Sequence, residues 1–304
     1  MSAPVLVDPE WIVSHPLARI IDLRWYLPGT GRRGAAEYMR GHIPGAIFLD
    51  LDTKLSGPPM AGPGRHPLPS PEQFEAAMAC AGISQNTDVV VYDDAGGSIA
   101  ARLWFLLRLF GHQGGAHILD GGLQAWNANG LSIETSPAQR PANPGPPFRA
   151  DTSRLATWIV DRAAVDRARA DGRTVILDAR VSERYRGDAE PIDARPGHIP
   201  GARSAPWIES LNKLGRMRPA AQLATYYARF GITPTSGAEH PIIAYCGSGV
   251  TACHTLLALH LAGIPDDAMC LYEGSWSDWA RDAALPAALG PDTTPAAPAA
   301  QSQG

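Results

Sequence analysis

Two long segments of this 304-residue chain repeat one another. The repeated motifs, each given as its first and second copy, are "IIDLR" (20–24) and "ILDAR" (176–180), "GHIPGA" (41–46 and 197–202), and "VVVYDD" (89–94) and "IIAYCG" (242–247). A period of about 155 residues is far longer than the 20–50 residues of solenoid repeats. The sequence therefore predicts two homologous domains.

The stretch between the two copies has a different composition. Residues 135–153 are rich in proline and show almost no apolar periodicity, which is typical of an extended linker. The last residues, 291–304, carry too few large apolar side chains to offset the entropy of ordering them. We expect a first domain over 1–134, a linker over 135–153, a second domain over 154–290 and a disordered tail over 291–304.

Short β-rich runs alternate with helical patterns inside each copy. The expected strands are 18–23, 46–49, 88–92, 116–119, 174–178, 241–245 and 268–272. Two of the helical stretches, 97–111 and 251–263, are apolar all round and end at glycine, a common helix stop. Continuous apolar strands alternating with helices indicate an α/β fold in which each domain has a mainly parallel sheet with helices on both faces.

Composition excludes several classes of function. The net charge is −4 and the basic residues are scattered, so no nucleic-acid partner is expected. No run approaches the ~18 apolar residues that cross a bilayer, and the start lacks the pattern of a secretory signal. A protein of the cytoplasm without membrane contact is therefore expected. Four cysteines are too few for a disulfide framework, and none forms the CxxC pair of a zinc site; no metal or cofactor is predicted.

Cys246 occupies an unusual place among the four cysteines. It directly follows an apolar strand, and the loop Cys246–Thr251 ("CGSGVT") leads into a helix. In parallel sheets, ligands bind beyond the carboxyl ends of the strands. Glycines at 247 and 249 let several N–H groups converge beside the positive end of the helix, where a thiol is expected to ionise readily. The alternative is a buried structural cysteine, which is how we interpret Cys80, Cys253 and Cys270.

These motifs together resemble the rhodanese family of sulfurtransferases in its tandem-domain form, over about residues 5–288. The motifs that support this are the two "GHIPGA" copies, "DAR" followed by "ERYRG" (178–187), "CGSGVTAC" (246–253) and "YEGSWSDW" (272–279). The resemblance implies a catalytically silent first domain, with Asp93 at the position of Cys246. It also implies that Cys246 accepts a sulfane sulfur as a persulfide, which a thiol such as thioredoxin or glutathione, or cyanide, then removes.

The loop after Cys246 resembles that of family members whose small-molecule donor is 3-mercaptopyruvate. Gly247, Ser248, Gly249, Val250 and Thr251 supply hydrogen-bond donors but no full charge next to the sulfur, which suits a monoanion better than the dianion thiosulfate. Ser248 and Thr251 are candidates to hold the sulfur or the donor's carbonyl, or else are ordinary loop and cap hydroxyls. An arginine in place of Gly247 is expected to shift preference toward thiosulfate.

An α-keto acid donor needs a guanidinium for its carboxylate. By resemblance, Arg184 matches a substrate-binding arginine, but the position of a frequent second one is Ile192, so Arg195 or Arg186 is a candidate substitute. By the same resemblance, His42 and Ser248 match members of a proposed Asp, His and Ser triad whose aspartate has no evident counterpart. His42 and its repeat His198 are alternatively structural.

Two other functions stay open from sequence alone, and a third is not expected. A thiosulfate sulfurtransferase differs only in its donor. A persulfide carrier or binding module would take up at most one equivalent of sulfur. A dual-specificity phosphatase has a related loop, but it requires an arginine where this chain has Ala252, so phosphatase activity is not expected.

Overall fold

The computed structural model describes residues 3–59, 62–138, 146–236 and 240–292. Within these ranges the chain forms two compact units. The first comprises residues 1–61, 68–155 and 213–216, and the second comprises 62–67, 156–212 and 217–304. The short segment Gly62–Pro67 thus packs with the second unit although it lies early in the sequence.

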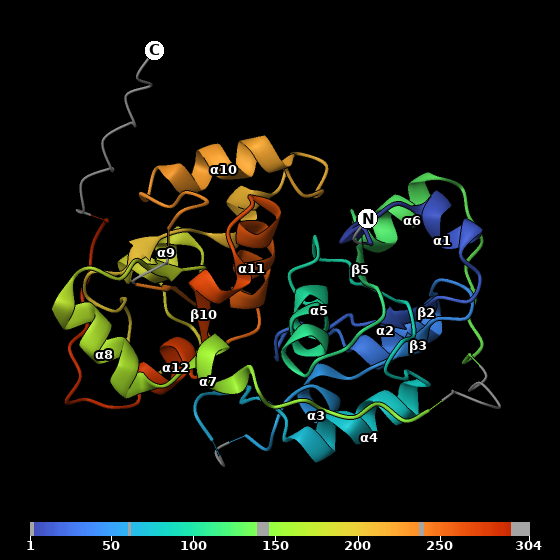
Figure 1. The fold of residues 1–304 in the computed structure, drawn as a ribbon, viewed down its shortest axis with the longest axis horizontal. Helices are drawn as coiled ribbons and strands as arrows, with labels where there is room; N and C mark the ends of the chain where they lie inside the picture. The colour runs from blue at the N-terminus through green and yellow to red at the C-terminus, as the bar shows by residue number, and fades with distance from the viewer. Residues whose placement is uncertain (1–2, 60–61, 139–145, 237–239, 293–304) are drawn as a thin grey trace. The chain divides into compact units, whose positions relative to one another are not determined.

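The first unit contains a five-stranded sheet in the order β1-β5-β4-β2-β3, and every strand pair in it is parallel. Its elements are β1 (Leu6–Val7), α1 (Pro9–Ser14), β2 (Arg19–Asp22), α2 (Gly34–Arg40), β3 (Ile47–Phe48), α3 (Leu51–Lys54), α4 (Pro71–Ala81), β4 (Val89–Tyr92), α5 (Ala100–Leu109), β5 (Ala116–Leu119) and α6 (Gly122–Ala128) (Figure 1).

The second unit repeats this arrangement with the order β6-β10-β9-β7-β8, again all parallel. Its elements are β6 (Ile159–Val160), α8 (Arg162–Asp171), β7 (Ile176–Asp178), α9 (Ser182–Arg186), β8 (Arg203–Ser204), η1 (Trp207–Ser210), α10 (Ala220–Ala228), β9 (Ile242–Tyr245), α11 (Ala252–Leu261), η2 (Asp266–Ala268), β10 (Met269–Tyr272) and α12 (Ser275–Trp279). The helix α7 (Leu155–Trp158) lies at the boundary.

Helices cover both faces of each sheet, as the apolar strands predicted. In the second unit α11 packs on β9 and β10. On the other face, Ile243 and Tyr245 of β9 share a core with Val165 of α8 and Trp276 of α12. Alternate residues of the same central strand are therefore buried under different helices, which explains why β9 has no polar positions.

The seven predicted strands all exist, each within two residues of its expected bounds. Three further two-residue strands, β1, β6 and β8, were not predicted. None of them lies in an apolar run longer than three residues, whereas the equally short β3 lies in the four-residue run 46–49. Of the predicted linker and tail, residues 139–145 and 293–304 lie outside the described residues. Asp292, at the start of the predicted tail, accepts hydrogen bonds from Arg203 and from the Ser204 amide.

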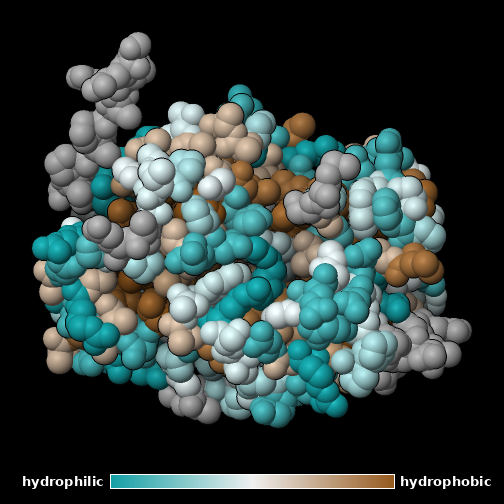
Figure 2. Space-filling model, in the orientation of Figure 1, coloured by the Kyte–Doolittle hydropathy of each residue, from teal (hydrophilic) through white to brown (hydrophobic). Residues whose placement is uncertain are grey.

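None of the helices in the described part of the chain is long and apolar enough to cross a membrane. Figure 2 shows one face of the molecule, on which hydrophilic side chains predominate and hydrophobic ones occur in small groups.

Candidate active site

The repeated motifs form the same network in both units. The Asp178 carboxylate accepts from Arg180, whose Nη2 also donates to the Gly197 carbonyl at 2.7 Å. Arg24 makes the equivalent bonds to Asp22 and to the Gly41 carbonyl in the first unit. These buried pairs tie the end of one strand to the "GHIPGA" turn. The motif that most clearly reveals the duplication is thus part of the scaffold.

The two histidines of the repeats also act as scaffold. His42 is fully buried, its Nδ1 lies 2.7 Å from the Tyr38 carbonyl, and its ring stacks on Tyr38. His198 makes the matching contacts with Tyr185, and burial lowers its pKa. The contacts of His42 support the structural interpretation over an auxiliary catalytic role.

Cys246 lies immediately after β9, in the loop that leads to α11. Its side chain is 2% exposed, and the Gly249 amide donates to its Sγ at 3.2 Å. Gly249 has φ +82°, and a Cβ there would lie 2.5 Å from the Glu273 carbonyl oxygen, so only glycine fits. The loop therefore turns an amide toward the sulfur, as the sequence predicted.

Ser275 holds the backbone of the cysteine from the neighbouring strand end. Its Oγ accepts from the Cys246 amide at 3.1 Å and donates to the Tyr272 carbonyl at 2.9 Å. Its φ is +53°, the only positive value of a non-glycine residue in the described ranges. Sequence reasoning did not select Ser275, because a strained backbone at a serine leaves no trace in residue type alone.

The equivalent loop of the first unit surrounds a carboxyl group of the chain itself. The Asp93 carboxylate accepts four backbone N–H groups, from Ala95, Gly97, Ile99 and Ala100, at 2.8–2.9 Å. Asp93 is 1% exposed. A strand-to-helix loop of this fold therefore does gather N–H groups around carboxylate oxygens, and in the first unit that place is filled by the chain itself.

Ser248 is bonded to a histidine that sequence reasoning missed. The Ser248 hydroxyl lies 2.7 Å from Nδ1 of His66, which is buried in the second unit. The predicted partner was His42. His66 is distant in the sequence and lies in "GRHPLP" (64–69), where no repeat or spacing singles it out.

Arg184 lies beside the cysteine loop, as the resemblance implied. Its Nη2 donates to Glu190 at 2.7 Å and to Asp193 at 2.8 Å. A Cβ on Gly247 would be 3.2 Å from Nη1 of Arg184 and 3.0 Å from Nη2 of Arg65. The loop residues themselves carry no charge, but two guanidinium groups from other segments reach Gly247. An arginine at position 247 would meet both of them, so the expected shift toward thiosulfate no longer follows.

Arg195 has a different environment from that expected of a substrate ligand. Its guanidinium donates to the backbone carbonyls of Trp279, Ala280 and Asp282 at 2.8–3.3 Å, which holds the end of α12. Arg186 pairs with Asp188 and Glu183 on the surface. Both guanidinium groups are therefore engaged by residues outside the cysteine loop. Val250 is buried and Thr251 is half-buried in the cysteine loop.

The remaining cysteines differ among themselves. Cys253 is fully buried and its Sγ donates to the Gly249 carbonyl at 3.4 Å. Cys270 donates to the Thr157 carbonyl, and burial raises its pKa to about 11. Cys80 on α4 is exposed, so the prediction that it is a buried structural residue is wrong.

This difference predicts unequal alkylation. Iodoacetamide at pH 8 should modify the exposed Cys80 at least about 100-fold faster than Cys270, because Cys270 is buried and a thiol of pKa about 11 is ionised to only about 0.1% there. Raising the pH to 10 should accelerate the labelling of Cys270 by about 90-fold, because its thiolate fraction then rises to about 9%. Peptide mass spectrometry after timed labelling measures both rates, and equal rates at pH 8 would contradict the described burial.

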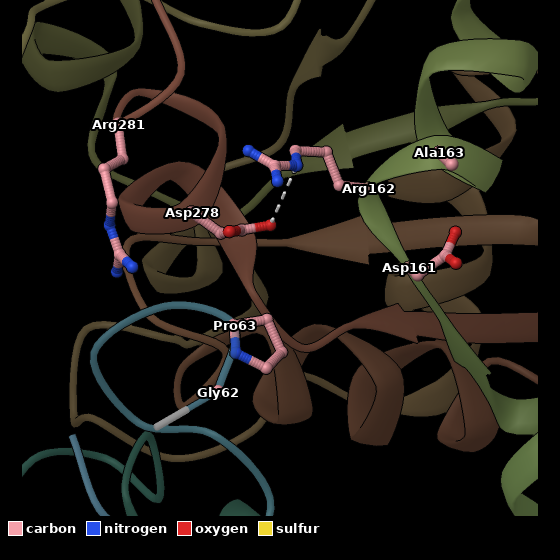
Figure 3. A pocket seen from close by; sticks show the side chains of 7 residues that line it. All are labelled: Gly62, Pro63, Asp161, Arg162, Ala163, Asp278 and Arg281. Atoms are coloured by element: carbon pink, nitrogen blue, oxygen red, sulfur yellow. Dashed lines mark ion pairs between the residues drawn. The ribbon is translucent and has the colours of Figure 1, made fainter. Parts of the chain in front are cut away.

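A pocket of about 460 Å³ lies elsewhere in the second unit (Figure 3). Arginine and aspartate side chains line it together with Gly62, Pro63 and Ala163. Arg162 is already paired with Asp278 and Asp282, and Cys246 is not among the lining residues. No group of three or more His, Cys, Asp or Glu side chains in the described ranges could hold a metal ion.

The fold and loop define a duplicated α/β protein in which one unit presents a cysteine, and the other a carboxylate, at the mouth of a strand-to-helix loop. Comparison with known proteins gives the family. The profile of the Rhodanese-like domain matches residues 12–129 and 161–282. The chain belongs to the rhodanese family.

Similar proteins align over most of the chain. A probable 3-mercaptopyruvate sulfurtransferase of Pseudomonas aeruginosa is 41% identical, with 91% of this chain and 94% of that protein covered. A putative thiosulfate sulfurtransferase, SseB of Mycobacterium tuberculosis, is 38% identical, with 89% and 90% covered. The crystal structure of the Escherichia coli 3-mercaptopyruvate sulfotransferase SseA is similar at a TM-score of 0.76 and 35% identity, covering 90% of this chain and 100% of that one.

Proposed function

We propose that this protein is a sulfurtransferase that takes sulfur from 3-mercaptopyruvate onto Cys246 and passes it to a thiol or to cyanide. The observation that carries the proposal is the loop after β9, where the Cys246 Sγ accepts an amide N–H and two guanidinium groups face the adjacent glycine. The names of two of the similar proteins support the same donor. A cytoplasmic location stays a prediction.

The proposed reaction has two steps. The Cys246 thiolate attacks the sulfur of 3-mercaptopyruvate, an S–S bond forms, and the C–S bond breaks. The electron pair of that bond leaves as the enolate of pyruvate, which takes up a proton. An acceptor thiolate or cyanide then attacks the outer sulfur of the persulfide, and Cys246 departs as a thiolate. No external oxidant is needed, because the electron pair that the sulfur gives up in the first step stays on C3 of the donor, which becomes the methyl group of pyruvate. The second step then passes on the sulfane sulfur without a further redox partner.

The surrounding residues have distinct roles in this proposal. Arg184, turned toward Gly247, binds the donor's carboxylate. The Ser248 hydroxyl, oriented by His66, hydrogen-bonds the donor's carbonyl oxygen as negative charge develops there. The loop amides, of which Gly249 is the observed example, stabilise the anionic sulfur.

Charge arithmetic favours a monoanionic donor over thiosulfate. The charged side chains linked around the loop are three arginines and three carboxylates: Arg65, Arg180, Arg184, Asp178, Glu190 and Asp193. Their sum is neutral, so a dianion would meet the thiolate without a net compensating charge. Each added repulsion costs about 1–4 kcal/mol at 4 Å for effective dielectrics of 80 to 20. Thiosulfate remains the second candidate, because one similar protein bears that name.

Arg184→Ala should lower kcat/KM for 3-mercaptopyruvate by about 10- to 150-fold, because a charged hydrogen bond to the carboxylate contributes about 1.5–3 kcal/mol. Pyruvate release at varied donor concentration measures this. Arg173, an exposed arginine that pairs with Asp171, supplies the control Arg173→Ala, which should keep wild-type kinetics. An unchanged kcat/KM in Arg184→Ala would remove Arg184 from the site.

The decisive experiment compares donors with the wild-type protein. We expect a higher kcat/KM for 3-mercaptopyruvate than for thiosulfate, with many turnovers per protein molecule when dithiothreitol or cyanide is in excess. The opposite preference would leave only the sulfurtransferase class. Release of no more than one equivalent of pyruvate would instead indicate a persulfide carrier.

A further inference from the structure

The segment Gly62–Pro67 is held rigidly against the cysteine loop of the second unit. Gly64 has φ +74°, and a Cβ there would lie 2.4 Å from the Gly274 carbonyl oxygen. The Arg65 amide donates to Ser277 Oγ at 3.1 Å, and the next side chain, His66, bonds Ser248. Contacts on both sides of Arg65 therefore determine where its side chain begins.

The end of the Arg65 side chain is held as well. Its Nη1 forms an ion pair with Oδ1 of Asp193, while Oδ2 of the same carboxylate accepts from Nη2 of Arg184 at 2.8 Å. Asp193 is 3% exposed. One buried carboxylate thus holds two guanidinium groups side by side. Burial, together with the charge of Arg184, lowers the pKa of Arg65.

The two arginines present different nitrogens to the carboxylates and to the loop. Glu190 and Asp193 accept from Nε and Nη2 of Arg184, and Asp193 pairs with Nη1 of Arg65. Gly247 is instead nearest to Nη1 of Arg184 and Nη2 of Arg65. Both nitrogens lie within 3.2 Å of one point, the place that a Cβ on Gly247 would occupy. Two N–H donors converging from two arginines match the two oxygens of a carboxylate.

We propose that Arg65 is the second guanidinium that binds the donor's carboxylate, with Asp193 as the positioning residue that holds it beside Arg184. The inference rests on the proposed function, since it assumes a donor with a carboxylate. It also accounts for Ile192, a partly exposed side chain at the position where a second arginine was sought. The two arginines come from distant parts of the sequence. Because Gly247 has no side chain, the space between them and the loop stays open for a carboxylate.

The test uses Arg65→Gln, which keeps most of the side-chain length and removes the charge. We expect KM for 3-mercaptopyruvate to rise about 10-fold or more, with a smaller change in kcat. Discharge of the preformed Cys246 persulfide by cyanide should stay within about twofold of wild type, because that step contains no donor carboxylate. Arg65→Lys should restore part of the lost affinity, and Arg173→Gln should change neither step.

A double variant separates binding from positioning. If Arg65 binds the donor directly, adding Arg65→Gln to Arg184→Ala should lower kcat/KM again by several-fold. If Arg65 only holds Asp193 and thereby Arg184, the double variant should equal Arg184→Ala, and the inference is overturned. A wild-type KM in Arg65→Gln would also overturn it. A wild-type protein that turns over thiosulfate but not 3-mercaptopyruvate would refute the proposed function instead.

Discussion

Cys246→Ser should abolish sulfur transfer, lowering turnover by at least about 10³-fold. A serine hydroxyl at this place keeps the size of the side chain but cannot form the persulfide. We expect the substitution to leave the rest of the loop as it is, including the Gly249 amide that donates to the cysteine Sγ. Pyruvate release from 3-mercaptopyruvate and thiocyanate formation with cyanide both measure the loss.

Cys253→Ser is the matched control, because Cys253 is a second buried cysteine of the same unit and lies in α11, directly after the loop that begins with Cys246. Its Sγ donates to the Gly249 carbonyl at 3.4 Å, a bond that a serine hydroxyl also makes. We expect this variant to retain most of its activity. Mass spectrometry after donor treatment should find one added sulfur, on Cys246. Equal losses in both variants would mean that the two cysteines act as a redox pair, and sulfur on another residue would refute the assignment.

Asp93→Ala should lower the free energy of unfolding of the first unit by about 3–5 kcal/mol. The four N–H groups that Asp93 now accepts would lose their partner in a buried place, and each unsatisfied buried donor costs about 1–3 kcal/mol, part of which is offset because a buried carboxylate is also removed. Denaturant titration of the full chain measures the loss, and hydrogen exchange at residues 95–100 locates it.

Asp93→Asn is the control for shape. The side-chain oxygen of asparagine still accepts backbone N–H groups. Its NH2 group, however, replaces the second oxygen and faces N–H donors that it cannot accept from, so we expect an intermediate loss of stability. If Asp93→Ala unfolds at the same denaturant concentration as wild type, the carboxylate is not what holds this loop, and the comparison of the two loops as anion-binding structures fails.

The sequence alone determined the fold and singled out the candidate nucleophile. The duplication and the apolar strands are encoded locally, because a buried parallel strand needs a continuous run of apolar residues that is visible in the chain itself. Cys246 was identifiable for the same reason, since a thiol between a strand and a helix with two loop glycines is a local pattern. The three strands that were missed are two residues long and carry no such pattern.

The chemistry around that cysteine depended on tertiary structure. His66 and Arg65 reach the loop from a segment about 180 residues earlier in the chain, whereas the candidates found from sequence, His42 and Arg195, bond backbone carbonyls. A histidine or an arginine has the same identity whether it supports a turn or faces a substrate. Only the fold decides which carbonyl, carboxylate or sulfur lies within hydrogen-bond distance of it.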